Sequence, residues 1–212
     1  MRYTLETAKQ IISKTISIDN IAQIGEGNHC QAFLINNKFV VKLPKHKKAS
    51  DCLYKEIKVL NYLKNKLNVE IPTVEFSKEY IINESIFIFY GSKIISGKKL
   101  SKKEFVELDE KTTKKNAEII ALFLFKLHKN KEIFNAKRKD YCLLHGDFSL
   151  NHCVFNNNIV TGILDFGDAK IGKFLSDFIY LLDDEDDEEF GVKFGNQVLS
   201  IYKKLGEKYD NI

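Results

Sequence analysis

Two short segments in the second half of the chain combine acidic, histidine and glycine residues at a spacing that suits chemistry. The first segment is His145-Gly146-Asp147-Phe148-Ser149-Leu150-Asn151-His152. The second segment, DFGD, begins with Asp165, eighteen residues after Asp147. An apolar run over 160–164 precedes Asp165 and predicts a carboxylate at the end of a buried strand, where it is well placed to bind a cation. His152 is a second possible metal ligand.

Two features in the first half of the chain suit a phosphate ligand. Gly25 and Gly27 lie between strand-like runs, where glycine lets the backbone approach a phosphate and exposes N–H donors. A plain turn is the alternative. Lys42 follows a valine pair in the next strand, and an ammonium among buried positions needs a partner. Glu56 on the following helix is a candidate partner, whereas a solvent-facing Lys42 would need none.

Residues 183–189 are seven consecutive carboxylates. We call this run the acidic segment. A charge run of this kind is commonly a solvated face or a mobile stretch. The alternative is a surface that attracts a ligand carrying several positive charges and speeds its capture.

The composition excludes several classes of protein. With 44% hydrophobic and 29% charged residues, the chain is neither collagen-like nor disordered. Arg2 and Arg138 are its two arginines and the net charge is +4, which argues against a nucleic-acid partner. The four cysteines form no C-x-x-C pair and indicate reduced thiols. Since no run is apolar enough for a signal peptide or a membrane span, we expect a cytoplasmic protein without a membrane partner.

Hydrophobic patterning predicts the elements that position these residues. In the first half we expect strands within 21–43 around an Asn36-Asn37 turn and a helix over 53–67 capped by Ser50-Asp51. Strand-like runs follow at 73–76 and 81–95, the second with Asn83-Glu84 as a turn between its parts. In the second half we expect a helix over 111–128, short strands around a turn at 156–158, and helices at 177–182 and 192–205. The predicted domains are 1–95 and 96–212.

The order of these motifs resembles that of the aminoglycoside phosphotransferases, and most closely their 2''-phosphotransferase branch. The resembling segments are IGEGNHCQAFLINNKFVVKLPK, YKEIKVLNYL, LLHGDFSLNHCVF, GILDFGDA and SDFIYLLDDEDDEEFG. The resemblance implies an α+β, bilobal protein-kinase-like fold. Its N-terminal lobe has an antiparallel sheet with one key helix, and its C-terminal lobe is mostly helical and shortened relative to the family.

The resemblance also implies a reaction: transfer of the γ-phosphate of ATP or GTP, with Mg²⁺, to a hydroxyl of an aminoglycoside antibiotic, which would confer resistance. It assigns Asp147 as the catalytic residue. The implied nucleotide-binding residues are Gly25, Gly27, Lys42, Glu56 and the hinge residues Lys93, Ile94 and Ile95. The implied metal ligands are His152 and Asp165, and the implied acceptor-binding residues are Asp147, Glu185, Glu188 and Glu189.

Some assignments stay open. His152 stands where the family usually has asparagine and is a softer ligand for Mg²⁺, so a water-mediated contact or Mn²⁺ is an alternative. Ser92 is a candidate gate to the purine, with Tyr90 or Gly91 as alternatives. The function itself has three alternatives: a kinase of another hydroxylated small molecule, a nucleotide-binding pseudokinase, or a phosphohydrolase built on His145, Asp147, His152 and Asp165. We expect a monomer.

Overall fold

The computed structural model describes residues 1–135, 138 and 140–210, and the chain divides into two compact units. Unit 1 comprises Met1–Asn61 and Pro72–Ile94, and unit 2 comprises Tyr62–Ile71 and Ile95–Ile212. The predicted division placed 62–71 in the first domain. In the structure this stretch packs within unit 2, because the Glu70 amide donates to the Thr161 carbonyl at 2.8 Å and the Asn68 side chain donates to the Ile119 carbonyl at 3.1 Å.

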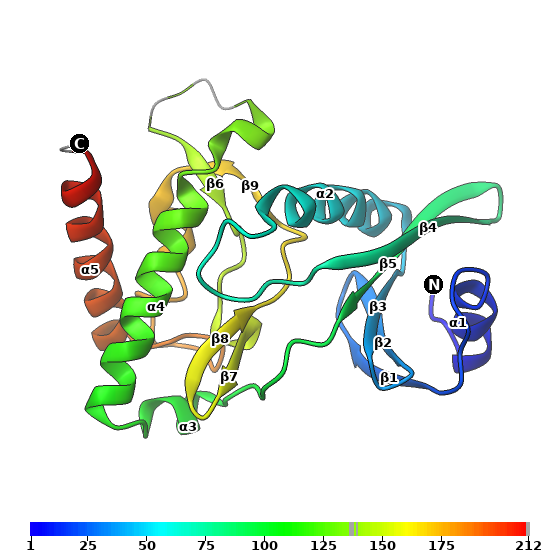
Figure 1. Cartoon of the computed structure of the whole chain (residues 1–212), viewed down its shortest axis with the longest axis horizontal. Coiled ribbons are helices and arrows are strands. Elements are labelled where there is room, and N and C mark those ends of the chain that lie inside the picture. Colours follow the sequence, from blue (N-terminus) through cyan, green and yellow to red (C-terminus); the bar gives the residue numbers. More distant parts are fainter. Residues whose placement is uncertain (136–137, 139, 211–212) are drawn as a thin grey trace. The chain divides into compact units, whose positions relative to one another are not determined.

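Unit 1 is built on a five-stranded antiparallel sheet with the strand order β1-β2-β3-β5-β4 (Figure 1). Its elements are α1 (Leu5–Ile12), β1 (Ile21–Glu26), β2 (Cys30–Ile35), β3 (Phe39–Pro44), α2 (Lys47–Leu63), β4 (Val74–Ile82) and β5 (Ser85–Lys93). Tyr3, Ala8 and Ile12 from the α1 region are buried in one core cluster with residues of β2, β3 and β5.

Two hairpin turns depend on residues with positive φ. Asn36 and Asn37 have φ of 53° and 51°, which is the backbone of a two-residue hairpin turn and agrees with the prediction. Asn83 and Glu84, with φ of 46° and 62°, reverse the chain between β4 and β5. This turn divides the run 81–95 where the sequence predicts it, and the first two residues of the run belong to β4.

Helix α2 begins earlier than predicted, and its N-terminus has a different cap. Ser50 and Asp51 lie inside the helix, and the Ser50 hydroxyl accepts a hydrogen bond from the Ile88 amide at 2.9 Å. The ring of His46 caps the helix instead, since its Nδ1 accepts from the Ala49 amide at 3.1 Å. Patterning also missed α1, whose N-cap Thr4 accepts from the Thr7 amide at 3.1 Å.

Unit 2 mixes helices with two short antiparallel strand pairs. Its helices are α3 (Lys102–Val106), α4 (Glu110–His128) and α5 (Val192–Asp210), with 3₁₀ turns η1 (Lys131–Phe134), η2 (Leu150–His152) and η3 (Phe174–Phe178). Strand β6 (Cys142–Leu144) pairs with β9 (Lys170–Gly172), and β7 (Cys153–Asn156) pairs with β8 (Ile159–Ile163). The predicted helix over 177–182 is wrong: residues 177–178 end the 3₁₀ turn η3 and residues 179–182 form a turn and a bend. The Asp177 carboxylate binds the amides of a neighbouring loop and does not cap a helix.

Helix α4 carries the apolar face that its periodicity predicted. Ala117, Ile120, Ala121, Leu124 and Leu127 are all fully buried. The N-cap is Asp109, which accepts from the Thr112 amide at 2.9 Å. The predicted α+β class with an antiparallel N-terminal sheet is confirmed. Within the described part of the chain, no helix combines the length and the apolar character that crossing a membrane requires.

Candidate active site

Asp147 lies in the loop between β6 and η2, and a buried carboxylate fixes the turn before it. The amides of His145 and Gly146 donate to the two oxygens of Asp177 at 2.8 and 2.9 Å. Gly146 has φ of 90°, and a Cβ there would overlap the Asp168 carbonyl oxygen, so the turn requires glycine. Sequence reasoning missed Asp177, since a single aspartate before an apolar run looks like a helix start.

Asp177 is itself held by residues of both long helices of unit 2. His128 of α4 lies 3.1 Å from Asp177 Oδ2 through Nε2, and its Nδ1 lies 2.9 Å from the Tyr202 hydroxyl of α5. Burial alone would raise the pKa of Asp177, but the hydrogen bond and charge of His128, assisted by the loop amides, outweigh burial and lower it. The carboxylate therefore stays ionised and keeps its hydrogen bonds with the loop amides.

His145 joins the two motifs from inside the protein. Its Nε2 donates to the Leu164 carbonyl at 2.9 Å, just before Asp165, and its ring packs against Phe148 and Phe166. Among the described residues, Nδ1 of His145 has no hydrogen-bond partner. Burial lowers the pKa of His145, so the ring is neutral. This geometry supports the interpretation that His145 holds the loop.

His152 lies between the two acidic residues of the site. Its Nδ1 lies 2.7 Å from the Asp147 carbonyl oxygen, a contact in which the nitrogen carries the proton. In a neutral ring the lone pair is then on Nε2, which lies 3.9 Å from Asp165 Oδ2. Asp165 has φ of 65°, so its side chain leaves the end of β8 in an uncommon direction for a residue other than glycine. The structure thus brings Asp147, His152 and Asp165 together.

This donor set can be tested against a divalent cation. Mg²⁺ binds through one or two carboxylates and keeps several waters, which suits Asp165 with its half-exposed side chain. Among the described residues, no group of three or more His, Cys, Asp or Glu side chains is placed to hold a metal. A two-ligand site of Asp165 and His152 that relies on water and substrate oxygens therefore fits, and the imidazole nitrogen is its softer member.

In unit 1 the structure brings Lys42 of β3 to Glu56 of α2. The Nζ to Oε1 distance is 2.8 Å, and the side chains of Lys42 and Glu56 are 19% and 1% exposed. Lys42 also lies over the Tyr90 ring, 6.0 Å from its centroid. Lys42 is therefore not on a solvated strand face, and its ammonium is held at a defined point. Whether it binds phosphate stays a prediction.

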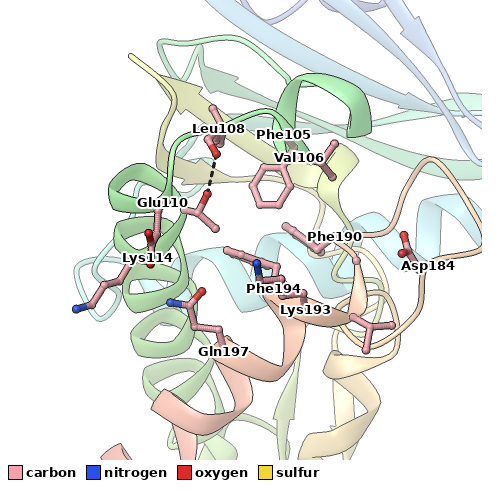
Figure 2. Close-up of a pocket in the computed structure, with 13 residues that line it drawn as sticks. Phe105, Val106, Leu108, Glu110, Lys114, Asp184, Phe190, Lys193, Phe194 and Gln197 are labelled. Carbon is pink, nitrogen blue, oxygen red and sulfur yellow. Dashed lines mark hydrogen bonds between the residues drawn. The ribbon is translucent and has the colours of Figure 1, made fainter.

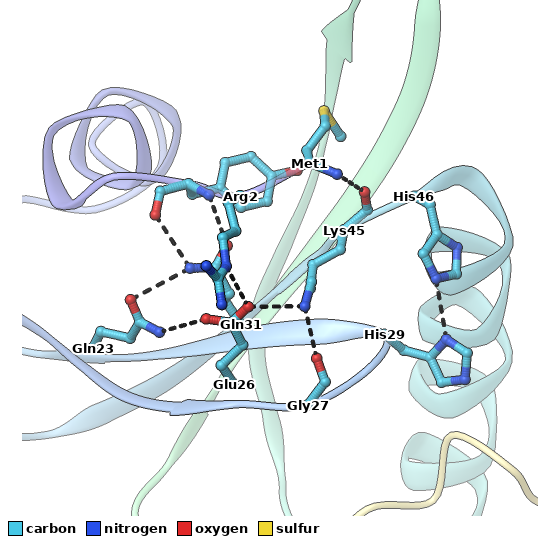
Figure 3. Close-up of polar contacts among 10 residues, drawn as sticks. Met1, Arg2, Gln23, Glu26, Gly27, His29, Gln31, Lys45 and His46 are labelled. Atoms are coloured by element: carbon cyan, nitrogen blue, oxygen red, sulfur yellow. Dashed lines mark hydrogen bonds and ion pairs between the residues drawn. The ribbon is translucent and has the colours of Figure 1, made fainter.

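The glycine turn between β1 and β2 is held by charged residues (Figure 3). The amide of Gly27 donates to the Cys30 carbonyl at 2.9 Å, and nothing lies within 4 Å of the place where a Gly27 side chain would start. Glu26 accepts from Lys45 at 2.9 Å and from Arg2 at 2.8 Å, and these contacts, that with Lys45 first, lower the pKa of Glu26 to about 2. Open space over an anchored turn suits a ligand that approaches the backbone.

The predicted hinge stands at the end of β5, where unit 1 meets the next segment of the chain. Ile94 donates its amide to the Lys38 carbonyl at 3.1 Å, so this N–H is engaged within unit 1. Ser92 is 6% exposed and pairs with Val40 across the sheet. The purine contacts of Lys93, Ile94 and Ile95 stay predictions.

The acidic segment is ordered and attached to the loop that carries Asp147. The Leu150 amide donates to the Glu188 carbonyl at 2.9 Å, and the Phe148 ring stacks on Phe190 at 5.5 Å. Glu189 is 5% exposed and its carboxylate accepts from the Asp186 amide at 2.7 Å, so it stabilises the segment from inside. Residues 184–188 are exposed, Glu185 and Glu188 included. A mobile, purely solvated run does not describe this geometry.

Tyr180 is a residue of this site that sequence reasoning missed. The negative charge of Asp147, together with partial burial and a hydrogen bond to Asp147, raises the pKa of the Tyr180 hydroxyl. The charges of Glu188 and Asp186 act in the same direction. The Tyr180 hydroxyl therefore lies between the catalytic candidate and the acidic segment, and a tyrosine in an apolar run gave no signal of this.

A cavity of about 580 Å³ lies beside the acidic segment, between α3 and the first turns of α4 and α5 (Figure 2). Its apolar wall includes Phe105, Phe190 and Phe194, and Asp184 lies at its rim. Lysines and carboxylates both line it, so its charge does not select a cation. Neither Asp147 nor Asp165 lines this cavity, which is therefore not where we place the reaction.

The profile described as the phosphotransferase enzyme family matches residues 129–210, which contain both motifs and the acidic segment. The protein is thus a phosphotransferase with a kinase-like fold, as predicted.

Several solved structures of phosphotransferases are similar to this chain. Aminoglycoside phosphotransferase APH(2'')-IIa in complex with gentamicin is 25% identical, with a TM-score of 0.78 over 96% of this chain and 82% of that one. ADP-bound APH(2'')-Ib is also 25% identical, with a TM-score of 0.75 over 92% and 80%. These matches confirm the resemblance to the aminoglycoside phosphotransferases and are consistent with the 2'' branch. The macrolide 2'-phosphotransferase MphH from Brachybacterium faecium, 11% identical, shares the fold, with a TM-score of 0.65 over 94% of this chain and 82% of that one.

Proposed function

We propose that the protein transfers the γ-phosphate of ATP or GTP to a hydroxyl group of an aminoglycoside. The observation that carries the proposal is the hydrogen bond from Leu150 to Glu188, which attaches the acidic segment to the loop of Asp147. Carboxylates beside a catalytic aspartate suit an acceptor that carries both ammonium and hydroxyl groups. Similar structures contain gentamicin, or streptomycin with ATP, or kanamycin with GDP, which supports this acceptor class and both purines.

In this proposal Asp147 receives the proton of the acceptor hydroxyl while the hydroxyl oxygen attacks the γ-phosphorus. The bond from that phosphorus to the β-phosphate oxygen breaks, and the nucleoside diphosphate leaves. Asp177 orients the loop of Asp147, and His145 keeps the two motifs in register. A Mg²⁺ held by Asp165 and His152 would neutralise charge on the phosphates.

The remaining assignments concern the two substrates. Lys42, positioned by Glu56, binds phosphate oxygens of the nucleotide, the turn of Gly25 and Gly27 covers them, and the backbone of Lys93–Ile95 meets the purine. Glu185 and Glu188 contact the ammonium groups of the acceptor. Glu189 contributes through the shape of the segment, because its carboxylate is used internally. We further propose that the protein is cytoplasmic, since nucleoside triphosphates are available in that compartment. We propose that it is a monomer.

The test is a transfer assay with purified protein, Mg²⁺, ATP or GTP, and a panel of aminoglycosides, read by mass spectrometry. We expect a gain of one phosphate on at least one antibiotic. Asp147→Asn should lose transfer and keep its nucleotide affinity, and Asp51→Asn, an exposed carboxylate paired with Lys47 at 2.8 Å, is the matched control. An acceptor with acetylated amino groups should react poorly.

The alternatives give different results in the same assay. Stabilisation by nucleotide without transfer to any acceptor would indicate a pseudokinase. Transfer to another hydroxylated compound and to no aminoglycoside would keep the reaction and change the acceptor. A phosphohydrolase needs neither Lys42 nor Glu56, so release of inorganic phosphate without transfer, at an undiminished rate in Lys42→Ala, would favour that function over a kinase.

A further inference from the structure

We propose that Lys102 is a positioning residue that holds the acidic segment in the conformation that receives a cationic acceptor. The proposal rests on the function proposed above and deepens it, because it names what orders the acceptor-binding surface. Lys102 belongs to α3, more than eighty positions before the segment, and no sequence motif includes it.

Lys102 makes two contacts with the segment through its ammonium group. Nζ donates to the Asp186 carbonyl at 2.8 Å and lies 2.9 Å from Asp184 Oδ1. The Lys102 side chain is 19% exposed, whereas that of Asp184 is 61% exposed. One contact is with the main chain, so Lys102 fixes the path of the backbone and does more than balance a charge.

The backbone of helix α3 at Lys102 is held in place by a cap and by packing. Ser101 and Glu104 form a capping box at the start of the helix, with the Ser101 amide donating to Glu104 at 2.9 Å. Phe105, three residues after Lys102, packs edge-on against Phe190 at 5.6 Å and Phe194 at 4.9 Å. The base of Lys102 and the residues that follow the acidic segment therefore share one aromatic cluster, visible in Figure 2.

Lys102 completes a set of attachments on the inner side of the segment. The Glu188 carbonyl is bound by Leu150, and the Asp186 amide is bound by Glu189, while Lys102 holds the Asp186 carbonyl and the Asp184 carboxylate. Seven adjacent carboxylates repel one another and would otherwise spread. With these attachments the acidic segment is already ordered before the acceptor binds. Binding then loses less conformational entropy, which favours it.

The two possible roles of Lys102 predict opposite effects. If its charge merely competed with the acceptor, its removal would tighten acceptor binding. If it positions the segment, its removal weakens binding. We infer the second, because the ammonium is already paired with Asp184 and its other bond goes to a carbonyl.

The first experiment needs no substrate and uses limited proteolysis by a glutamate-specific protease under native conditions. In Lys102→Ala, we expect cleavage within residues 185–189 to be at least about fivefold faster than in the wild type, because local opening exposes the segment. Lys103→Ala is the matched control, since it removes the same charge from the exposed neighbouring position of α3 and should leave the cleavage rate unchanged. Lys102→Arg should restore the wild-type rate.

The second experiment measures transfer kinetics of the same variants. We expect Lys102→Ala to raise the acceptor KM about tenfold with kcat within about twofold, since Asp147 keeps its own support. Lys103→Ala and Lys102→Arg should stay close to the wild type.

The outcomes separate this inference from the proposed function. A wild-type protein that phosphorylates no aminoglycoside overturns the function, and the proteolysis still judges the role of Lys102. Unchanged cleavage in Lys102→Ala overturns the positioning role. Faster cleavage with an unchanged or lower acceptor KM overturns the link between the ordered segment and the acceptor.

Discussion

At the scale of single residues, Asp177 is the polar group on which the geometry of the site most depends. It is 1% exposed and accepts hydrogen bonds from two loop amides while it pairs with His128. Loss of one partner from a buried charged network leaves the others without compensation. The Asp147 side chain is 40% exposed, and its position depends on Asp177, a buried neighbour.

Asp177→Ala should lower the free energy of unfolding by about 3–5 kcal/mol, the usual cost of breaking a buried pair. Tyr202→Phe, which removes the hydroxyl bound to His128 and leaves the carboxylate in place, should cost about 1 kcal/mol. Urea denaturation at neutral pH measures both. Equal effects of the two changes would contradict the central place of Asp177.

The cost of Asp177→Ala should also depend on pH. The folded-state pKa of Asp177 lies below its ordinary value of 3.8, so the stabilisation is complete well above 3.8 and is lost as pH falls through the folded-state pKa. The difference between wild type and variant should therefore be constant above about pH 5 and shrink below about pH 4. A difference that stayed constant down to pH 2 would mean that Asp177 has the same pKa in the folded and unfolded states, and would contradict the lowered pKa.

At the scale of elements, α5 packs closely against Leu181, just before the acidic segment, and this close contact is made at Gly195. A Cβ at Gly195 would overlap the Leu181 carbonyl oxygen, whereas a Cβ at Gly206 of the same helix would meet nothing within 4 Å. The helix thus carries a close-approach site and an open site with the same residue type. The same Gly→Ala change at both positions gives the same gain in helix propensity, so a difference in stability reports the close contact at Gly195.

Gly195→Ala should destabilise the protein by about 1–3 kcal/mol because the backbone has to move away from Leu181. Gly206→Ala should stabilise it by about 0.5–1 kcal/mol, since alanine is the better helix former in open space. Thermal or urea unfolding of the two variants gives the comparison. Stabilisation by both changes would mean that α5 does not pack this closely.

At the scale of the whole molecule, the charge is unevenly distributed along the chain. The net charge is +4 although seven carboxylates are consecutive in one ordered, attached segment. Electrostatic attraction between such a surface and a polycation acts at a distance and is screened by salt. The rate of acceptor capture should therefore respond to ionic strength.

We expect kcat/KM for an aminoglycoside to fall several-fold as NaCl rises from about 0.05 to about 0.3 M. The double variant Glu185→Gln/Glu188→Gln should show a shallower dependence, because two exposed charges are gone. Steady-state kinetics over a salt series measures both slopes. Parallel slopes would place the acceptor away from the acidic segment.

The sequence by itself determined the class of fold and the order of the motifs. The hydrophobic face of α4 and the Asn36-Asn37 turn are local features, and periodicity and turn chemistry report them directly. The pairing of Asp147 with Asp165 is expected from the order and spacing of the two motifs. The resemblance in motif order was sufficient to identify a kinase-like phosphotransferase, which the comparisons confirm.

The tertiary structure alone decided what supports those motifs. His46 caps α2 with an untypical side chain, Asp177 reaches back to the loop of Asp147, and Lys102 reaches forward to Asp184 and Asp186. The contact of His46 is local but made by an unusual capping side chain, whereas Asp177 and Lys102 act across long sequence separations, and no periodicity records such contacts. Tertiary packing brings these groups within hydrogen-bond distance, because a buried or clustered charge is stable only where the fold supplies its partner.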